Sequence, residues 1–299
     1  MRILLTGTTG QVGGALLPLL EGHGEIFAPT REEFDLSRPA LLADRLDRLK
    51  PDLIINPAAY TAVDRAEDET ELAFTINAEA PARMAGWAAP HQVPLVHFST
   101  DYVFDGSGDK PWQEDSIPAP LSVYGASKLA GENAIRSANG PHLIVRTSWV
   151  YAAKGANFLR TIARLAGESK ELKIVADQIG APTTARVIAN TVMEIVSPDL
   201  QNLARPFARD AGTVNIICAN KTSWHGFATA IVEGLKKRGV KLAAESVVPI
   251  TTKDYPTKAK RPSNSCLNLS RLSGVYGIVT PSWIDALNVE LDELARELI

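Results

Sequence analysis

The chain has 299 residues, of which 45% are hydrophobic and 22% are charged, and its formal net charge is -3 at pH 7. This length can fill one large domain or two modest ones, and the dispersed lysines and arginines exclude a broad basic face for nucleic acid. No basic-then-apolar leader and no apolar stretch near 18 residues occurs, so we expect no membrane span and a cytoplasmic protein.

Apolar runs alternate with helical patterns through the first half of the chain. The expected strands are residues 3–6, 25–30, 53–56, 95–99 and 143–147. Such alternation predicts an α/β fold with a doubly wound parallel sheet covered by helices on both faces. Ligands of such sheets bind beyond the carboxyl ends of the strands, where polar residues follow each expected strand.

A glycine-rich turn, Gly7-Thr-Thr-Gly10-Gln-Val-Gly13, connects the first expected strand to an apolar helical pattern. Gly7 permits the tight turn, Gly10 lets the backbone approach a pyrophosphate, and Gly13 lets the helix pack close to the strand. The helix N-terminus would then face the anion. A purely structural glycine turn is the alternative, but the order of strand, turn and helix favours a dinucleotide site.

The choice of cofactor depends on the end of the second expected strand. An acidic residue there would bind the ribose 2'-hydroxyl of NADH, whereas Thr30 and Arg31 offer a hydroxyl and a cation that suit a 2'-phosphate. We therefore predict NADPH, with NADH as the alternative. Asp35 and Leu36 follow closely and are expected either to contact the adenine or to form a turn.

The second half of the chain is less regular. Helical patterns and short apolar runs occupy residues 157–166, 172–175, 214–218, 224–236 and 282–298. We expect residues 1–150 to form the dinucleotide-binding domain and residues 151–299 mainly a smaller substrate-binding lobe. Segments between about 170 and 240 are candidates to return to the main sheet.

Tyr124 and Lys128 are four residues apart, so on a helix they would share one face. A lysine ammonium beside a phenol favours the ionised phenol, so we expect Lys128 to lower the pKa of Tyr124 and make it a proton donor. Thr100 ends the fourth strand and could stabilise an alkoxide as hydride arrives. Together these residues predict carbonyl reduction, against the alternatives of a surface pair and a turn-capping hydroxyl.

Metal-dependent chemistry has little support in the sequence. The two cysteines and five histidines are scattered without the spacing of metal ligands. We therefore predict no metal site.

Nearly the whole chain resembles the extended short-chain dehydrogenase/reductases, and within them the dTDP-4-dehydrorhamnose reductase group. The resemblance lies in an ordered series of motifs. These are residues 7–13, 56–64 (NPAAYTAVD), 99–106 (STDYVFDG), 124–132 (YGASKLAGE), 146–151 (RTSWVY), 177–183 (DQIGAPT) and 261–265 (RPSNS).

The resemblance implies a Rossmann-type fold and NADPH-dependent reduction of the C4 ketone of dTDP-4-dehydro-L-rhamnose to dTDP-L-rhamnose, for polysaccharide synthesis. It implies that Tyr124 donates the proton, that Lys128 holds the nicotinamide ribose, and that Thr100 assists at the carbonyl. The residues expected at the cofactor are Gly7, Gly10, Gln11, Val12, Gly13, Thr30, Arg31, Asp35, Leu36, Ala58, Ala59, Tyr60, Thr61, Ser99, Tyr124 and Lys128. Those expected at the sugar nucleotide are Thr100, Asp101, Trp149 and Arg261.

Two departures and two alternatives accompany this resemblance. Some similar proteins form magnesium-bridged dimers through a first-helix glutamate, but this chain has Ala15 there, which disfavours a magnesium bridge and leaves monomer and homodimer open. Thr30 stands where relatives that use NADH often have an acidic residue at the end of the second strand, which again favours NADPH. An NAD-dependent nucleotide-sugar dehydratase or epimerase is one alternative, although a dehydratase usually adds an acidic pair beside the threonine, where this chain has Asp101 and Tyr102. A regulatory subunit resembling that of methionine adenosyltransferase is the other, and the retained Thr100, Tyr124 and Lys128 argue against it.

Overall fold

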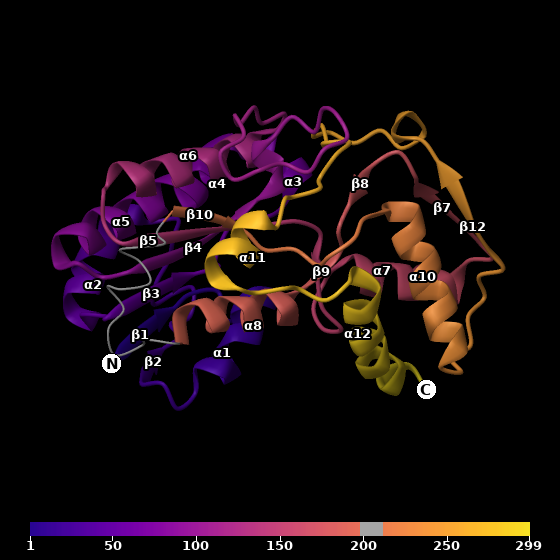
Figure 1. Cartoon of the computed structure of the whole chain (residues 1–299), viewed down its shortest axis with the longest axis horizontal. Coiled ribbons are helices and arrows are strands. Elements are labelled where there is room, and N and C mark those ends of the chain that lie inside the picture. Colours follow the sequence, from indigo (N-terminus) through magenta and orange to yellow (C-terminus); the bar gives the residue numbers. More distant parts are fainter. Residues whose placement is uncertain (198–211) are drawn as a thin grey trace.

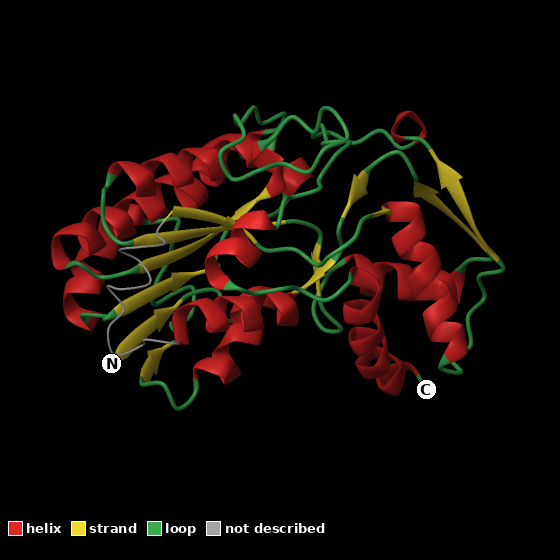
Figure 2. Ribbon diagram, in the orientation of Figure 1, coloured by secondary structure: helices red, strands yellow, loops and turns green. Residues whose placement is uncertain are grey.

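The computed structural model describes residues 1–197 and 212–299, and its main feature is a six-stranded parallel sheet (Figures 1 and 2). In spatial order the strands are β10 (Gly212–Asn215), β5 (His142–Thr147), β4 (Leu95–Thr100), β3 (Leu53–Asn56), β1 (Arg2–Leu5) and β2 (Glu25–Phe27). Every neighbouring pair runs parallel. The predicted doubly wound sheet is confirmed, and β10 at its edge comes from beyond residue 150.

Helices cover both faces of the sheet (Figure 1). One face carries α1 (Gln11–Leu20), α8 (Ala185–Val196) and α11 (Ser270–Tyr276). The other carries α2 (Leu42–Leu49), α5 (Ala80–His91) and α6 (Val123–Ser137). Shorter elements on the second side are a 3-10 turn (Pro39–Leu41), α3 (Val63–Ala66), α4 (Thr70–Phe74) and a π-helical turn (Thr75–Glu79).

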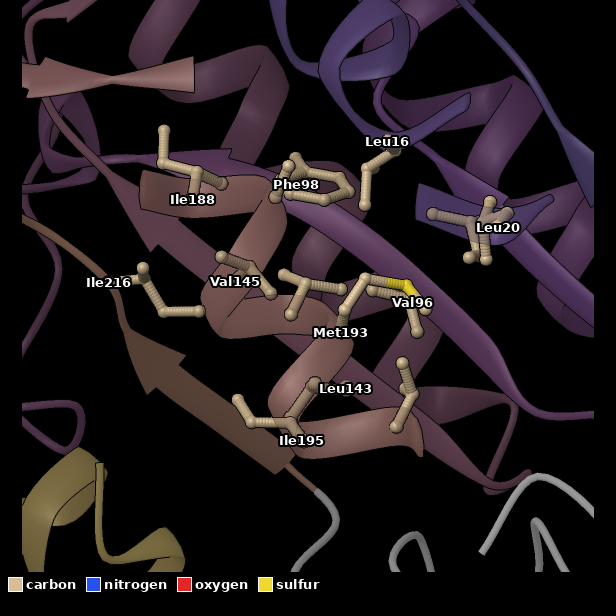
Figure 3. Close-up of a cluster of buried hydrophobic side chains, with 14 of the residues drawn as sticks. Leu16, Leu20, Val96, Phe98, Leu143, Val145, Ile188, Met193, Ile195 and Ile216 are labelled. Atoms are coloured by element: carbon tan, nitrogen blue, oxygen red, sulfur yellow. The ribbon is translucent and has the colours of Figure 1, made fainter. Parts of the chain in front are cut away.

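The strands are buried on both faces, which explains their continuous apolar sequences. Ile3 and Leu5 of β1 point into one hydrophobic cluster, and Leu4 between them points into the other. Figure 3 shows the first cluster, in which Phe98 of β4 packs beside α1 and α8. These two clusters hold the sheet rigid, so the loops at its carboxyl edge start from fixed points.

The remaining elements form a smaller lobe beside the sheet, on the right in Figure 2. Its helices and longer strands are α7 (Phe158–Glu168), β7 (Glu171–Val175), α10 (Trp224–Lys237), β12 (Ser246–Ile250) and α12 (Trp283–Leu298). Short strands connect the two parts: β6 (Val150–Tyr151) with β9 (Thr183–Thr184), and β8 (Ile179–Gly180) with β11 (Thr222–Ser223). The lobe has a hydrophobic core of its own, centred on Tyr151, Phe227 and Leu291.

The order of the strands creates a crevice. From β1 the chain moves outward to β2, then returns to the other side of β1 to form β3. The loops that follow β1 and β3 therefore separate at the carboxyl edge, which is the place where open α/β sheets bind ligands. Among the described residues, no helix combines the length and apolar character needed to cross a membrane.

Candidate active site

A cavity of about 1040 Å³ opens at the carboxyl edge of the sheet. Small-molecule sites usually measure about 300–1,000 Å³, so this cavity can hold a ligand as large as a dinucleotide. The predicted site residues that line it are Gly7, Gly10, Gln11, Val12, Gly13, Thr30, Arg31, Asp35, Leu36, Ala58, Ala59, Tyr60, Thr61, Ser99, Thr100, Asp101, Tyr124, Lys128 and Trp149. Thus Thr100, Tyr124 and Lys128, which are distant from the glycine turn in sequence, share one cavity with it.

The glycine turn is shaped for close backbone approach. Gly7 has φ +61°, a left-handed conformation that glycine adopts without strain. A Cβ on Gly13 would lie 2.2 Å from the carbonyl oxygen of Gly7, so only glycine lets α1 pack this close. The N-cap of α1 is Gly10, which supplies no side-chain cap, and the first turn of α1 contains no acid. The first residues of α1 line the cavity, so this uncapped helix N-terminus suits a pyrophosphate.

The end of β2 presents a cation to the same cavity. The Arg31 side chain is 78% exposed, and its Nε lies 4.0 Å from Asp35 Oδ1. An exposed pair at this distance is weak, so Arg31 can turn towards another anion. Asp35 is held by hydrogen bonds from the Ser37 N–H (2.9 Å) and hydroxyl (2.7 Å). Burial raises the pKa of Asp35, but the hydrogen bonds from Ser37 and the charges of Arg31 and Arg38 together outweigh it and leave the pKa below its usual value.

Tyr124 and Thr100 meet at the centre of the site. Tyr124 lies in the first turn of α6, and Thr100 is the last residue of β4. Burial raises the pKa of Tyr124 to about 12, a hydrogen bond with Thr100 lowers it, and Asp101 raises it further. The Thr100 hydroxyl also donates to Asp101 Oδ1 (3.1 Å) and accepts from the Tyr102 N–H (3.2 Å). Burial raises the pKa of Asp101 to about 7, against hydrogen bonds from Ser265 and Thr100.

Lys128 corrects one expectation. It shares the α6 face with Tyr124, but its Nζ donates to the Phe98 carbonyl oxygen (2.6 Å) and lies 3.1 Å from His97 Nε2. The expectation that Lys128 lowers the pKa of Tyr124 is wrong for this arrangement, because burial dominates and raises that pKa. Burial likewise lowers the pKa of Lys128 to about 8, while Glu132 raises it.

Two tryptophans form an aromatic wall at the lobe side of the cavity. The rings of Trp149 and Trp224 stack with centroids 3.6 Å apart and planes 12° apart. Trp149 has φ +48°, an uncommon conformation for a bulky residue, and it directs the indole against Gly180. A Cβ on Gly180 would lie 2.6 Å from the indole, so the glycine of the 177–183 motif makes room for this wall. Indole faces pack on the apolar C–H groups of a sugar ring.

Arg261 is not among the residues that line the cavity, although its charge interacts with Tyr102, which does line it. Its guanidinium forms an ion pair with Asp64 of α3, with Nη2 2.7 Å from Oδ2. Hydrogen bonding and the charge of Asp64 raise the pKa of Arg261 against the lowering effect of burial. The ion pair ties the segment before residue 262 to the main sheet domain, and the proposed sugar contact of Arg261 stays a prediction.

Sequence reasoning missed several residues of the site. Trp224 follows no local motif, and only its place at a helix start could have drawn attention to it. Asn56 is the last residue of β3 and His97 lies in the middle of β4; both are buried, and their side chains are 3.1 Å apart. The signal that could have identified these two residues is the presence of a polar side chain within an expected buried strand. Within residues 1–197 and 212–299, no group of three His, Cys, Asp or Glu side chains could hold a metal ion.

The doubly wound sheet, the glycine turn and the Tyr124–Lys128 pair beside Thr100 define an extended short-chain dehydrogenase/reductase. Comparison with known proteins narrows this class. A family model described as RmlD substrate binding domain matches residues 1–296. A dTDP-4-dehydrorhamnose reductase from Burkholderia thailandensis is 44% identical over 99% of this chain and 100% of its own length. The reductase of that name from Escherichia coli strain K12 is 41% identical over 98% of each chain.

Solved structures agree with this placement. A dTDP-4-dehydrorhamnose reductase from Clostridium acetobutylicum has a TM-score of 0.89 at 34% identity, covering 98% of this chain and 99% of its own. A Bacillus anthracis reductase of that name, crystallised with NADP, has a TM-score of 0.87 at 31% identity with the same coverage. The chain belongs to the RmlD family.

Proposed function

We propose that the protein reduces the C4 ketone of dTDP-4-dehydro-L-rhamnose to dTDP-L-rhamnose with NADPH, a step in nucleotide-sugar synthesis for polysaccharide. The observation that carries the proposal is the convergence of Thr100, Tyr124 and Lys128 with the glycine turn in one cavity. The names of the similar full-length proteins from Burkholderia thailandensis and Escherichia coli support the choice of substrate.

The residues present fit a dinucleotide phosphate. The uncapped start of α1 and the close-packed glycines suit the pyrophosphate, and Arg31 suits a 2'-phosphate. The Bacillus anthracis structure contains NADP, which supports NADPH as the reductant here. We propose that the nicotinamide ribose lies against Tyr124 and Lys128.

The chemistry requires two electrons and two hydrogens at the ketone. NADPH, when bound, supplies hydride to the carbonyl carbon. The Thr100 hydroxyl turns its one hydrogen from Asp101 Oδ1 to the carbonyl oxygen, where negative charge develops. The Tyr124 hydroxyl then gives its proton to that oxygen, which completes the alcohol and leaves a phenolate to be reprotonated from solvent. Lys128, held by the Phe98 carbonyl, orients the ribose.

The sugar ring is proposed to lie against the wall of Trp149 and Trp224, with Asp101 beside Thr100. This arrangement presents an apolar ring face to indole and the polar C4 oxygen to the two hydroxyls. Reduction therefore takes place at one end of a pocket whose other end holds the adenosine half of the cofactor.

The test is to follow nicotinamide absorbance with purified protein, NADPH and dTDP-4-dehydro-L-rhamnose, and to identify the product by mass spectrometry and NMR. We expect one NADPH oxidised for each dTDP-L-rhamnose formed. A dehydratase or epimerase would retain NAD and convert sugar nucleotides without net oxidation of added NADPH. A regulatory subunit would oxidise none, so either result would refute the proposal.

Other expectations stay predictions. They are a dinucleotide-binding domain of residues 1–150 with later segments returning to it, a substrate lobe of residues 151–299, a sugar contact by Arg261, a cytoplasmic location, and a monomeric or homodimeric state. The return of β10 to the sheet and the separate core of the lobe support the first two.

A further inference from the structure

Four buried polar side chains are connected in series by hydrogen bonds beneath the active site, and we call this series the hydrogen-bond chain. Lys128 Nζ lies 3.1 Å from His97 Nε2, and His97 Nδ1 lies 3.1 Å from Asn56 Nδ2. The Thr6 hydroxyl donates to Asn56 Oδ1 at 2.6 Å. The chain therefore links the lysine of α6 through β4 and β3 to the end of β1, directly before the glycine turn.

Each member of this chain is almost fully buried. Asn56 and His97 are 0% exposed, Lys128 is 2% exposed and Thr6 is 3% exposed. Buried polar groups are strongly selected to have partners, because an unpaired one costs about 1–3 kcal/mol. The donors and acceptors along the chain must therefore match at every link.

A neutral imidazole has one donor nitrogen and one acceptor nitrogen, so the chain has a direction. In the arrangement described, the Asn56 amide donates to His97 Nδ1, which places the ring proton on Nε2. An Nε2–H facing Lys128 suits a neutral amine, which can accept. An ammonium has three donors and no acceptor, so His97 Nε2 must then accept from Lys128. The ring proton of His97 then lies on Nδ1, and the Asn56 amide must be reversed so that its oxygen accepts from that Nδ1–H.

We propose that His97 and Asn56 are positioning residues for Lys128, and that their hydrogen bonds reverse direction when Lys128 gains or loses its proton. In the ammonium form, Lys128 donates to both His97 Nε2 and the Phe98 carbonyl oxygen, which fixes its place at the cofactor ribose. The kinetic consequence of this inference rests on the proposed function, whereas the reversal itself does not.

The surroundings keep His97 neutral throughout. Burial, with a smaller contribution from the charge of Lys128, holds the pKa of His97 well below its usual value. Tyr124 shares the α6 face with Lys128, and the α6 carboxylate Glu132 also acts on Lys128 but is itself paired with Arg146 of β5 at 2.7 Å. Lys128 is thus the group whose gain or loss of a proton sets the direction of these hydrogen bonds.

The direct test uses histidine nitrogen NMR on the protein alone. With ¹⁵N-labelled histidine the five residues give five ring systems, and a His97→Gln variant identifies that of His97. Between pH 6 and 10 we expect His97 to stay neutral and its proton to move from Nδ1 to Nε2 as Lys128 deprotonates. In Lys128→Met the tautomer should not change with pH. An imidazolium form at pH 6, one tautomer throughout, or the same change in Lys128→Met would overturn the inference.

A second test separates positioning from a merely structural role. His97→Leu removes the acceptor for the ammonium, whereas His97→Gln can keep one near the Nε2 position. A hydrogen bond to a charged group is worth about one pKa unit or more. With saturating NADPH, the alkaline fall of kcat/KM should begin about one pH unit lower in His97→Leu, and its NADPH Kd should rise severalfold.

In His97→Gln, and in the control His142→Gln on β5, the alkaline limb should stay within about 0.3 pH unit of the native one. An unmoved limb in folded His97→Leu would contradict the inference, as would an equal shift in the control. If the protein reduced no keto sugar, the proposed function would fail while the NMR result still decided the reversal.

Discussion

Replacing Tyr124 with Phe tests the assigned proton donor most directly. The variant loses one hydroxyl and its hydrogen bond with Thr100, while the ring can keep its edge contact with Tyr102, whose centroid is 5.5 Å away. General acid catalysis contributes about 10²–10⁴-fold, so kcat should fall by that factor. A lost hydrogen bond costs about 1 kcal/mol, so the fold should persist.

The assay is NADPH oxidation with the keto sugar, together with NADPH affinity measured by fluorescence titration. We expect affinity within about threefold of the native value, because only a transition-state interaction is lost. Tyr102→Phe is the matched control, since Tyr102 is also a phenol that lines the cavity. Near-native kcat in Tyr124→Phe, or an equal loss in Tyr102→Phe, would refute the assignment.

The other variants probe separate parts of the site. Arg31→Ala should raise KM for NADPH about tenfold and leave KM for NADH unchanged, whereas Arg45→Ala, at a half-buried residue outside the cavity lining, should change neither. Equal effects on both cofactors would argue against a 2'-phosphate contact. Trp224→Leu should raise KM for the keto sugar about tenfold or more and leave KM for NADPH unchanged, as measured by steady-state kinetics. An unaltered KM for the keto sugar would show that the tryptophan wall does not contact the sugar. Arg261→Ala and Asp64→Ala should destabilise the protein non-additively if their ion pair is structural, whereas a sugar KM raised only in Arg261→Ala would favour substrate contact. Asp101 has a folded pKa of about 7 against 3.8 in the unfolded chain, so the folded state binds the extra proton and stability falls as pH rises between these values. From pH 5 to 7 the native protein should lose up to about 3 kcal/mol relative to Asp101→Asn, measured by urea unfolding; parallel pH dependences would contradict the raised pKa.

The residues predicted for the cofactor half of the site line one cavity, because they lie in short motifs directly after strands. A parallel sheet brings the ends of all its strands to one edge, so local motifs become neighbours without any knowledge of side-chain packing. The expected second strand was three residues too long, since β2 ends at Phe27. Pro29 lacks the N–H that a longer strand needs.

Contacts made across the fold could not be predicted in this way. Trp224 reaches the cavity because the lobe places the start of α10 beside Trp149, and nothing near Trp224 in sequence records that placement. Arg261 belongs to a matched motif, yet its side chain pairs with Asp64 in the structure. A motif fixes which residue is present, whereas the partner of a long side chain depends on what the tertiary fold brings near.

The pKa of Tyr124 differs from the sequence expectation, but its direction is compatible with the role that we propose for this residue. The helical spacing predicted a phenol made more acidic by Lys128, but burial raises the pKa to about 12. A donor in a reduction must hold its proton until hydride has arrived, and a phenol with this pKa is fully protonated at neutral pH. The alkoxide formed on the sugar is a far stronger base than phenolate, so the transfer remains downhill. Burial therefore keeps the proposed donor protonated, and the role that we propose for Lys128 is to place the ribose.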